Sequence, residues 1–408
     1  MMTKKKQFGW VLIMALITAC SSTPKQAMQK EVSTIDLTEI EFSSTPQPLS
    51  DFVESIEYIK LSEEPLVTDA KKVNVAEDKN GNLYLDVPGG LLKYAPDGTF
   101  IKNLVKIGKG PGEIAMKLGT IFNMDRDFML ISAYGVDYPK INLNGEWLGR
   151  VKRTYVPERW VYSYWKDYEI YKHTVIGDEK DDEINRDGEY FFHVKDIRTD
   201  STIYQMKNPY AHIKGKRGGP RLAKMGYPAY RGPLNESTYW FKPLFIDTVY
   251  CTTDWTDVRP LYVIKQHSSA ADYEWNIKED ASVRNFSQNE LLNTRRLGAV
   301  WALENGILYF YYLEIKEGKL GFGFCPANGK GKYISLLFKN DIDEYCPPLD
   351  FSSIMDDCSL FYKNGYIYIP VNAFEFFEEG AKPPFPDLTE DSNPVIVKLK
   401  LKKKQPSK

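Results

Sequence analysis

Residues 73–101 read VNVAEDKNGNLYLDVPGGLLKYAPDGTFI, and this stretch decides the fold. Short runs rich in apolar and β-branched residues are separated by the pairs Asn80-Gly81 and Asp97-Gly98. A residue that tolerates positive φ, followed by Gly, is a strong hairpin signal when alternating segments flank it. The stretch therefore predicts four consecutive antiparallel strands joined by three short connections.

The same pattern returns along the rest of the chain, where convincing helical periodicity is almost missing. Further hairpin pairs are Asn144-Gly145, Asp187-Gly188, Asn305-Gly306, Asn328-Gly329 and Asn364-Gly365. We count six units of three or four strands between residues 51 and 401, and such units are typical of the blades of a β-propeller. The predicted fold class is all-β, a six-bladed β-propeller. A β-sandwich with an open edge is the alternative.

One strand precedes the first complete unit and is expected to close the ring. Residues 55–61 alternate as a strand does, and a leftover terminal strand can complete the last blade and remove an open edge. We expect this N-terminal strand to pair within the sheet that contains Val395–Leu399. The six units average about 58 residues, more than compact propeller repeats contain. Long connections are therefore expected at residues 177–188, 208–237, 266–297 and 373–393, with a short helix within 279–297.

The N-terminus carries the parts of a bacterial export signal. Residues 4–6 are lysines, residues 10–17 are apolar, and small residues precede Cys20. A spanning helix needs about 20 apolar residues, so this shorter run favours a removed signal over a membrane anchor. A thiol just behind the cleavage point can carry diacylglycerol, and two or more acyl chains, palmitate among them, hold a protein firmly on a membrane. The sequence predicts a lipoprotein attached through Cys20.

These observations divide the chain into four parts. We expect a signal peptide at 1–19, a lipidated N-terminus and linker at 20–50, a propeller at 51–401 and a basic tail at 402–408. Polar residues 21–30 offer little apolar surface to bury, so they are expected to form a flexible spacer. The predicted location is the cell envelope, at the outer membrane, with the periplasmic and surface faces both open.

Charge and cysteine content exclude some partners. The 53 basic and 55 acidic residues give a formal charge of -2, which removes the electrostatic drive that nucleic-acid binding requires. Four cysteines remain besides Cys20, and they allow three disulfide pairings. No C-x-x-C motif or ligand-like histidine spacing is present, so we expect no metal site and no cofactor. The four cysteines are Cys251, Cys325, Cys346 and Cys358.

Two basic, glycine-containing stretches are the candidate ligand-binding loops. Closely spaced backbone N–H groups and a lysine in residues 108–113 can cradle an anion, although the G-K-[ST] ending of a P-loop is missing. Residues 214–221 supply a second basic stretch, and two such loops at one mouth would suit an acidic sugar or a phosphate. Solvated turns are the alternative. The candidate residues are Lys109, Gly110, Gly112, Glu113, Lys216 and Arg217.

Residues 76–85 and 92–100 resemble one NHL-type propeller repeat. With the signal at Cys20, the strand at 55–61 and the glycine loop at 108–113, the chain resembles the bacterial six-bladed β-propeller lipoproteins. The later units depart from the repeat. This resemblance implies a propeller fold and an envelope location, and it implies no established activity.

The sequence favours binding over catalysis. No nucleophile elbow, Ser-His-Asp set or Cys-His motif stands out, so no catalytic residue is assigned. Our hypothesis is a lipid-anchored binding or interaction module for an oligosaccharide, a peptide or a partner protein. The alternative is an envelope carbohydrate-active enzyme, a polysaccharide lyase or glycoside hydrolase, with its site at the channel mouth. A third hypothesis is a structural subunit of an outer-membrane uptake complex.

Overall fold

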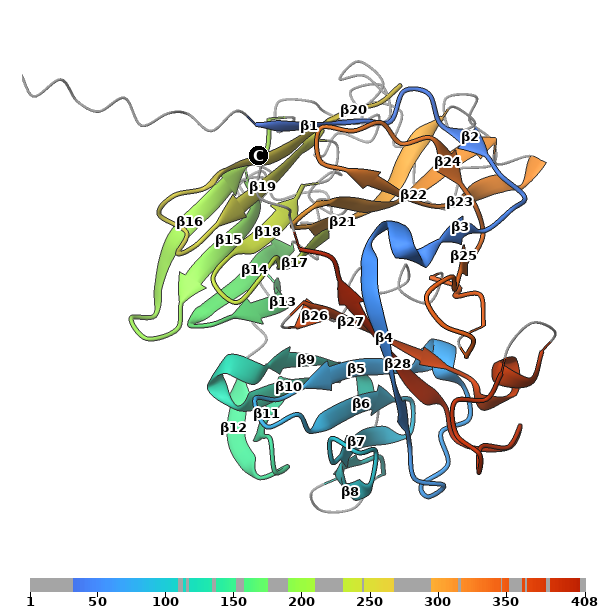
Figure 1. Ribbon diagram of the computed structural model, residues 1–408. Coiled ribbons are helices and arrows are strands. Elements are labelled where there is room, and N and C mark those ends of the chain that lie inside the picture. The colour runs from blue at the N-terminus through green and yellow to red at the C-terminus, as the bar shows by residue number, and fades with distance from the viewer. Residues whose placement is uncertain are drawn as a thin grey trace, which may run out of the picture. The chain divides into compact units, whose positions relative to one another are not determined.

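The described part of the chain consists of β-strands, turns and short 3-10 helices in this computed structural model (Figure 1). No α-helix occurs among the described residues, and none of their helices is long and apolar enough to cross a membrane. The predicted all-β class is confirmed. The described residues are 32–108, 113–114, 117–133, 137–151, 158–174, 190–209, 230–243, 246–267, 295–314, 317–345, 347–351, 362–363, 365–378 and 382–403.

Three four-stranded antiparallel sheets follow one another in the first half of the chain. Each sheet is built from four strands that are consecutive in sequence, as the hairpin signals predict. Sheet 1 contains β5 (Asn74–Glu77), β6 (Leu83–Val87), β7 (Gly90–Tyr94) and β8 (Phe100–Lys106). Sheet 2 contains β9 (Lys117–Asn123), β10 (Phe128–Ala133), β11 (Tyr138–Asn142) and β12 (Trp147–Val151). Sheet 3 contains β13 (Glu158–Trp165), β14 (Tyr168–Thr174), β15 (Tyr190–Asp196) and β16 (Ser201–Lys207).

Three more sheets follow, and two of them recruit a strand from the N-terminus. Sheet 4 contains β17 (Tyr230–Pro233), β18 (Tyr239–Lys242), β19 (Thr248–Thr252), β20 (Arg259–Lys265) and, beside β20, β1 (Ser33–Asp36). Sheet 5 contains β21 (Arg296–Leu303), β22 (Gly306–Glu314) and β23 (Lys319–Pro326). Sheet 6 contains β26 (Tyr362–Lys363), β27 (Tyr366–Val371), β28 (Val395–Leu401) and β4 (Val53–Lys60). Strands β17 and β1 were not predicted from the sequence.

The expected pairing of the N-terminal strand is confirmed. Strand β4 runs antiparallel to β28, from Lys60 opposite Val395 to Ser55 opposite Lys400. In Figure 1 the blue β4 lies beside the red β28, so segments from the two ends of the folded region share sheet 6. This pairing gives β28 a partner on its second side, which removes one unpaired strand edge.

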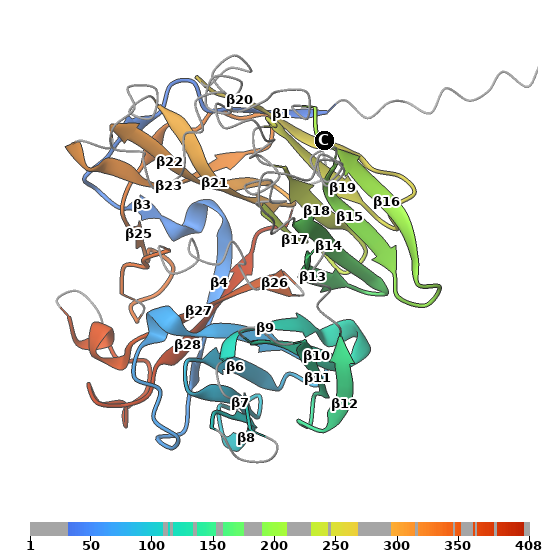
Figure 2. The same cartoon turned by 180° about the vertical axis from the view of Figure 1, so that it is seen from behind.

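The segment that precedes β4 is folded, although we expected a linker up to residue 50. Strand β1 pairs in parallel with β20, while β2 (Glu41–Phe42) pairs with β24 (Tyr333–Ile334) and β3 (Gln47–Pro48) with β25 (Phe338–Lys339). Ile35, Leu37 and Leu49 are fully buried. Burial of these apolar side chains holds the segment on the sheets. We call residues 33–51 the N-terminal strap, and Figure 2 shows it crossing from β20 to β25.

Each sheet is linked to the next one in the chain. An ion pair joins Lys79 to Asp127 (3.0 Å) between sheets 1 and 2, and Asn123 Nδ2 donates to Lys166 O (3.3 Å) between sheets 2 and 3. Ser163 Oγ and Tyr239 Oη (2.9 Å) join sheets 3 and 4, and Tyr262 Oη donates to Leu303 O (2.7 Å) between sheets 4 and 5. The ring of Phe324 in sheet 5 lies 5.5 Å from that of Phe52, the residue directly before β4 of sheet 6. The Tyr368 hydroxyl of sheet 6 donates to Glu77 of sheet 1. The links therefore return to the sheet with which they began.

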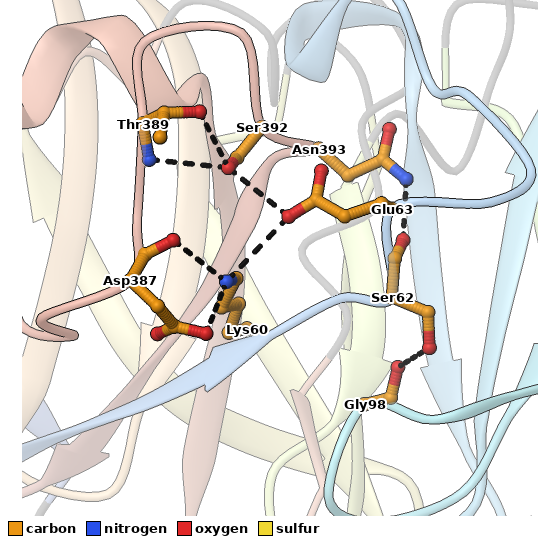
Figure 3. Close-up of polar contacts among 8 residues, drawn as sticks. All are labelled: Lys60, Ser62, Glu63, Gly98, Asp387, Thr389, Ser392 and Asn393. Atoms are coloured by element: carbon orange, nitrogen blue, oxygen red, sulfur yellow. Dashed lines mark hydrogen bonds and ion pairs between the residues drawn. The ribbon is translucent and has the colours of Figure 1, made fainter.

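A polar junction fixes the connection that leaves β4 (Figure 3). Lys60 Nζ donates to the Asp387 carboxylate at 2.8 Å and lies 3.5 Å from Glu63. Ser392 Oγ donates to the same Glu63 carboxylate at 3.1 Å. Asn393 is fully buried, and its amide donates to Ser62 O at 2.6 Å and to Pro65 O at 2.9 Å. These bonds tie the end of β4 to the long connection between β27 and β28.

Candidate functional site

The first glycine loop is closed at its base by backbone pairing. Gly108 N–H donates to Ile114 O at 3.1 Å, and Ile114 N–H donates to Lys106 O at 3.0 Å. Glu113 is exposed, and its carboxylate lies over Gly108, where an added Cβ would be 2.0 Å from Oε2. The candidates Lys109, Gly110 and Gly112 lie outside the described residues. The described base of this loop therefore presents a carboxylate.

A buried ion pair follows this loop directly. Lys117 begins β9 and pairs with Asp86 of β6, and the two side chains are 3% and 4% exposed. Lys117 Nζ also donates to Val87 O at 2.8 Å. Burial raises the pKa of Asp86, while Lys117 and then Thr120 act in the opposite direction. Through these two interactions, Lys117 joins sheet 2 to sheet 1.

The second basic stretch leads into sheet 4. The candidates Lys216 and Arg217 lie outside the described residues. The first described residue after them, Tyr230, begins β17 and lies opposite Lys242 at the end of β18. The Lys242 side chain is buried, and its ammonium lies 5.9 Å from the centre of the Tyr230 ring.

Lys242 differs from Lys117 in having no carboxylate within ion-pair distance among the described residues. Within the part of the chain that the structure describes, its ammonium donates to Pro243 O at 3.4 Å. Burial lowers the pKa of Lys242 to about 8, with a smaller opposing effect from Asp247. A buried lysine of this kind can supply a positive charge to an anionic group or, when neutral, act as a base.

Polar groups of sheets 4 and 5 are joined to Asp247 and Tyr230, the two residues that act on Lys242. Asp247 lies in the connection between β18 and β19, and it accepts a hydrogen bond from Gln266 Nε2. Gln266 Oε1 accepts from the backbone N–H of Leu297 at 3.1 Å, while the Tyr230 hydroxyl donates to Gly298 O. We call this contact between sheets 4 and 5 the Lys242 seam. No local pattern indicates this seam, because in sequence a single lysine at a strand end resembles a solvated one.

The cysteines and acidic groups provide no second site among the described residues. Cys251 and Cys325 are buried free thiols, and burial raises the pKa of Cys325 to about 12. Cys346 and Cys358 lie outside the described residues, as does Cys20. Within the described residues, no group of three His, Cys, Asp or Glu side chains is placed to hold a metal ion.

Comparison with known proteins identifies the family. The family model described as "Domain of unknown function (DUF4934)" matches residues 32–400. The chain belongs to this family. No curated protein matches the DUF4934 chain significantly. The family description carries no activity, and membership of an NHL-type lipoprotein family stays a prediction.

Solved structures resemble the DUF4934 chain at low sequence identity. An exported protein from Bacteroides fragilis NCTC 9343 has a TM-score of 0.56 and 13% identity, covering 91% of this chain and 100% of that one. A member of the DUF4221 family from Bacteroides vulgatus ATCC 8482 has a TM-score of 0.47 and 14% identity, covering 86% and 97%. An oligogalacturonate lyase from Vibrio parahaemolyticus has a TM-score of 0.34 and 10% identity, covering 85% and 96%. The first structure shares the fold with this chain, and no function is inferred from the other two.

Proposed function

We propose that this DUF4934 domain is a six-bladed β-propeller that serves as a binding module in the cell envelope. The links between sheets support the ring, because they run from sheet 1 to sheet 6 in chain order and then return to Glu77 of sheet 1. The pairing of β4 with β28 supports closure by the N-terminal strand. In a closed ring every sheet has a neighbouring sheet on both sides.

The proposed location rests on the signal before Cys20 and on the exported neighbour from Bacteroides fragilis. Lipidation of Cys20 would attach the protein to the outer membrane. The segment between Cys20 and Ser33 can extend over about 40 Å. The folded region would then be tethered near the membrane with freedom to meet a partner.

One observation carries the binding proposal: both basic glycine-containing stretches lead into the first strand of a sheet, β9 for one and β17 for the other. First strands contact each other between sheets, as β9 does with β13 and β17 with β21. In a propeller the first strands surround the central axis. Lys109 and the Lys216–Arg217 pair would then reach one mouth, where a negatively charged oligosaccharide or peptide could bind.

A thermal-shift screen of the full-length protein in non-ionic detergent tests this proposal. Acidic oligosaccharides are expected to raise the melting temperature, and Lys109→Ser combined with Arg217→Ser should abolish the rise. Lys332→Ser is the matched control, because Lys332 is an exposed lysine far along the chain from both loops. An equal rise in the double variant contradicts the proposal. Turnover of a glycan, lost on replacing one carboxylate, supports the enzyme alternative.

A further inference from the structure

Two buried donors in the Lys242 seam have no good acceptor among the described residues. The Lys242 ammonium carries three N–H donors, and its single described acceptor lies 3.4 Å away. The Tyr311 hydroxyl is fully buried, and no described residue accepts its proton in a hydrogen bond. Buried donors in folded proteins almost always have a partner, so an unmatched pair at one seam requires a physical explanation.

A series of contacts between sheets 4 and 5 connects the two donors. Lys242 lies opposite Tyr230, whose hydroxyl donates to Gly298 O in β21. The residue before Gly298, Leu297, lies opposite Tyr311 in β22. On the other side, Gln266 bridges the Leu297 backbone to Asp247. Asp247 acts electrostatically on both Lys242 and Tyr311, and the His267 backbone N–H acts on the Tyr311 oxygen, so the two donors share one carboxylate as a neighbour.

The chemistry of the missing partner follows from the groups that face this region. Lys242 and Tyr311 both need an acceptor, because both present protons. The charged groups that act on Lys242 or Tyr311 are Asp247 and Arg295, and together with Lys242 they give a net charge of about +1. An anionic acceptor would neutralise this charge and form charge-assisted hydrogen bonds.

We propose that the Lys242 seam binds a single carboxylate group, with Lys242 and Tyr311 as its donors. The buried Lys117 provides a comparison within the same chain, because its ammonium is matched by the Asp86 carboxylate. In the Lys242 seam that carboxylate would come from a ligand. Described residues of sheets 4 and 5 carry this inference without either glycine loop, so it does not depend on the proposed function.

An acetate titration of the full-length protein at constant ionic strength tests this inference. Melting is followed by tryptophan fluorescence, with chloride replaced by acetate or by galacturonate. At about ten times the dissociation constant, the melting temperature should rise by about 2 °C. A rise with acetate indicates a free small carboxylate, whereas a rise with galacturonate alone indicates the carboxylate of a sugar.

Variants decide whether the effect belongs to the seam. Lys242→Met should abolish the rise, and Tyr311→Phe should reduce it, because each removes one donor. Lys117→Met and the Lys109→Ser, Arg217→Ser double variant should retain it, which separates this site from the buried ion pair and from the proposed loops. Absence of a rise with either carboxylate, or an equal rise in Lys242→Met, overturns the inference and leaves a buried water as the acceptor.

Discussion

Replacing Lys242 by Met is expected to stabilise the protein at neutral pH in a carboxylate-free buffer. Met has a similar length and no charge, so it can fill the same buried space without desolvating an ammonium group. The pKa of Lys242 falls from 10.5 to about 8 in the folded protein. Each pKa unit corresponds to about 1.4 kcal/mol, so the charged form costs about 3 kcal/mol of folding stability.

The sign of the pH dependence follows from proton binding. Between pH 8 and 10.5 the unfolded chain holds the Lys242 proton while the folded protein has released it. Stability of the wild-type protein therefore rises with pH across this window. Below pH 8 the charged Lys242 lowers the stability by the full amount of about 3 kcal/mol, and above pH 10.5 this destabilisation disappears. The advantage of the Met variant should shrink accordingly as pH increases.

Urea unfolding of both proteins at several pH values from about 7 to about 10 measures this difference. Other titrating groups are common to the two proteins, so they cancel in the comparison. Lys332→Met serves as the control, because this exposed lysine should give a difference near zero. A Met variant that is less stable than wild type at pH 7, or an advantage that does not change with pH, refutes the reasoning.

Three further substitutions test the packing, each by urea unfolding. Asp86→Asn leaves the buried Lys117 without its carboxylate and should cost about 3–5 kcal/mol, whereas adding Lys117→Met should recover part of the loss. Asn393→Ala removes the side-chain bonds to Ser62 O and Pro65 O and should cost about 2–4 kcal/mol. Leu37→Ala should cost about 2–5 kcal/mol, because Leu37 is fully buried in the strap.

Small effects would contradict these three expectations in different ways. A loss below about 1 kcal/mol for Asp86→Asn would mean that water reaches the pair. A neutral Asn393→Ala would mean that the junction in Figure 3 does not hold the connection after β4. A neutral Leu37→Ala would mean that the strap is detached in solution.

The sequence by itself determined most strands and the closing pair. Local chemistry is sufficient for this, because Asn80-Gly81 and Asp97-Gly98 supply the positive φ that their turns require, at Gly81 and Gly98. The alternation of apolar and polar residues in 55–61 predicted the closing strand, and β4 does pair with β28. These signals depend on a few neighbouring residues, so they can be recognised in the amino-acid sequence.

The tertiary structure alone decided the strap, β17 and the Lys242 seam. β17 spans four residues and contains Gly232 and Pro233, so its composition indicates a loop. β1 pairs with a strand more than 200 residues away, which no local pattern can specify. Lys242 is 4% exposed at the end of β18. The free-energy cost of its charge depends on how the chain packs around it, because desolvation is set by the groups that surround a side chain in space and leaves no mark on its neighbours in sequence.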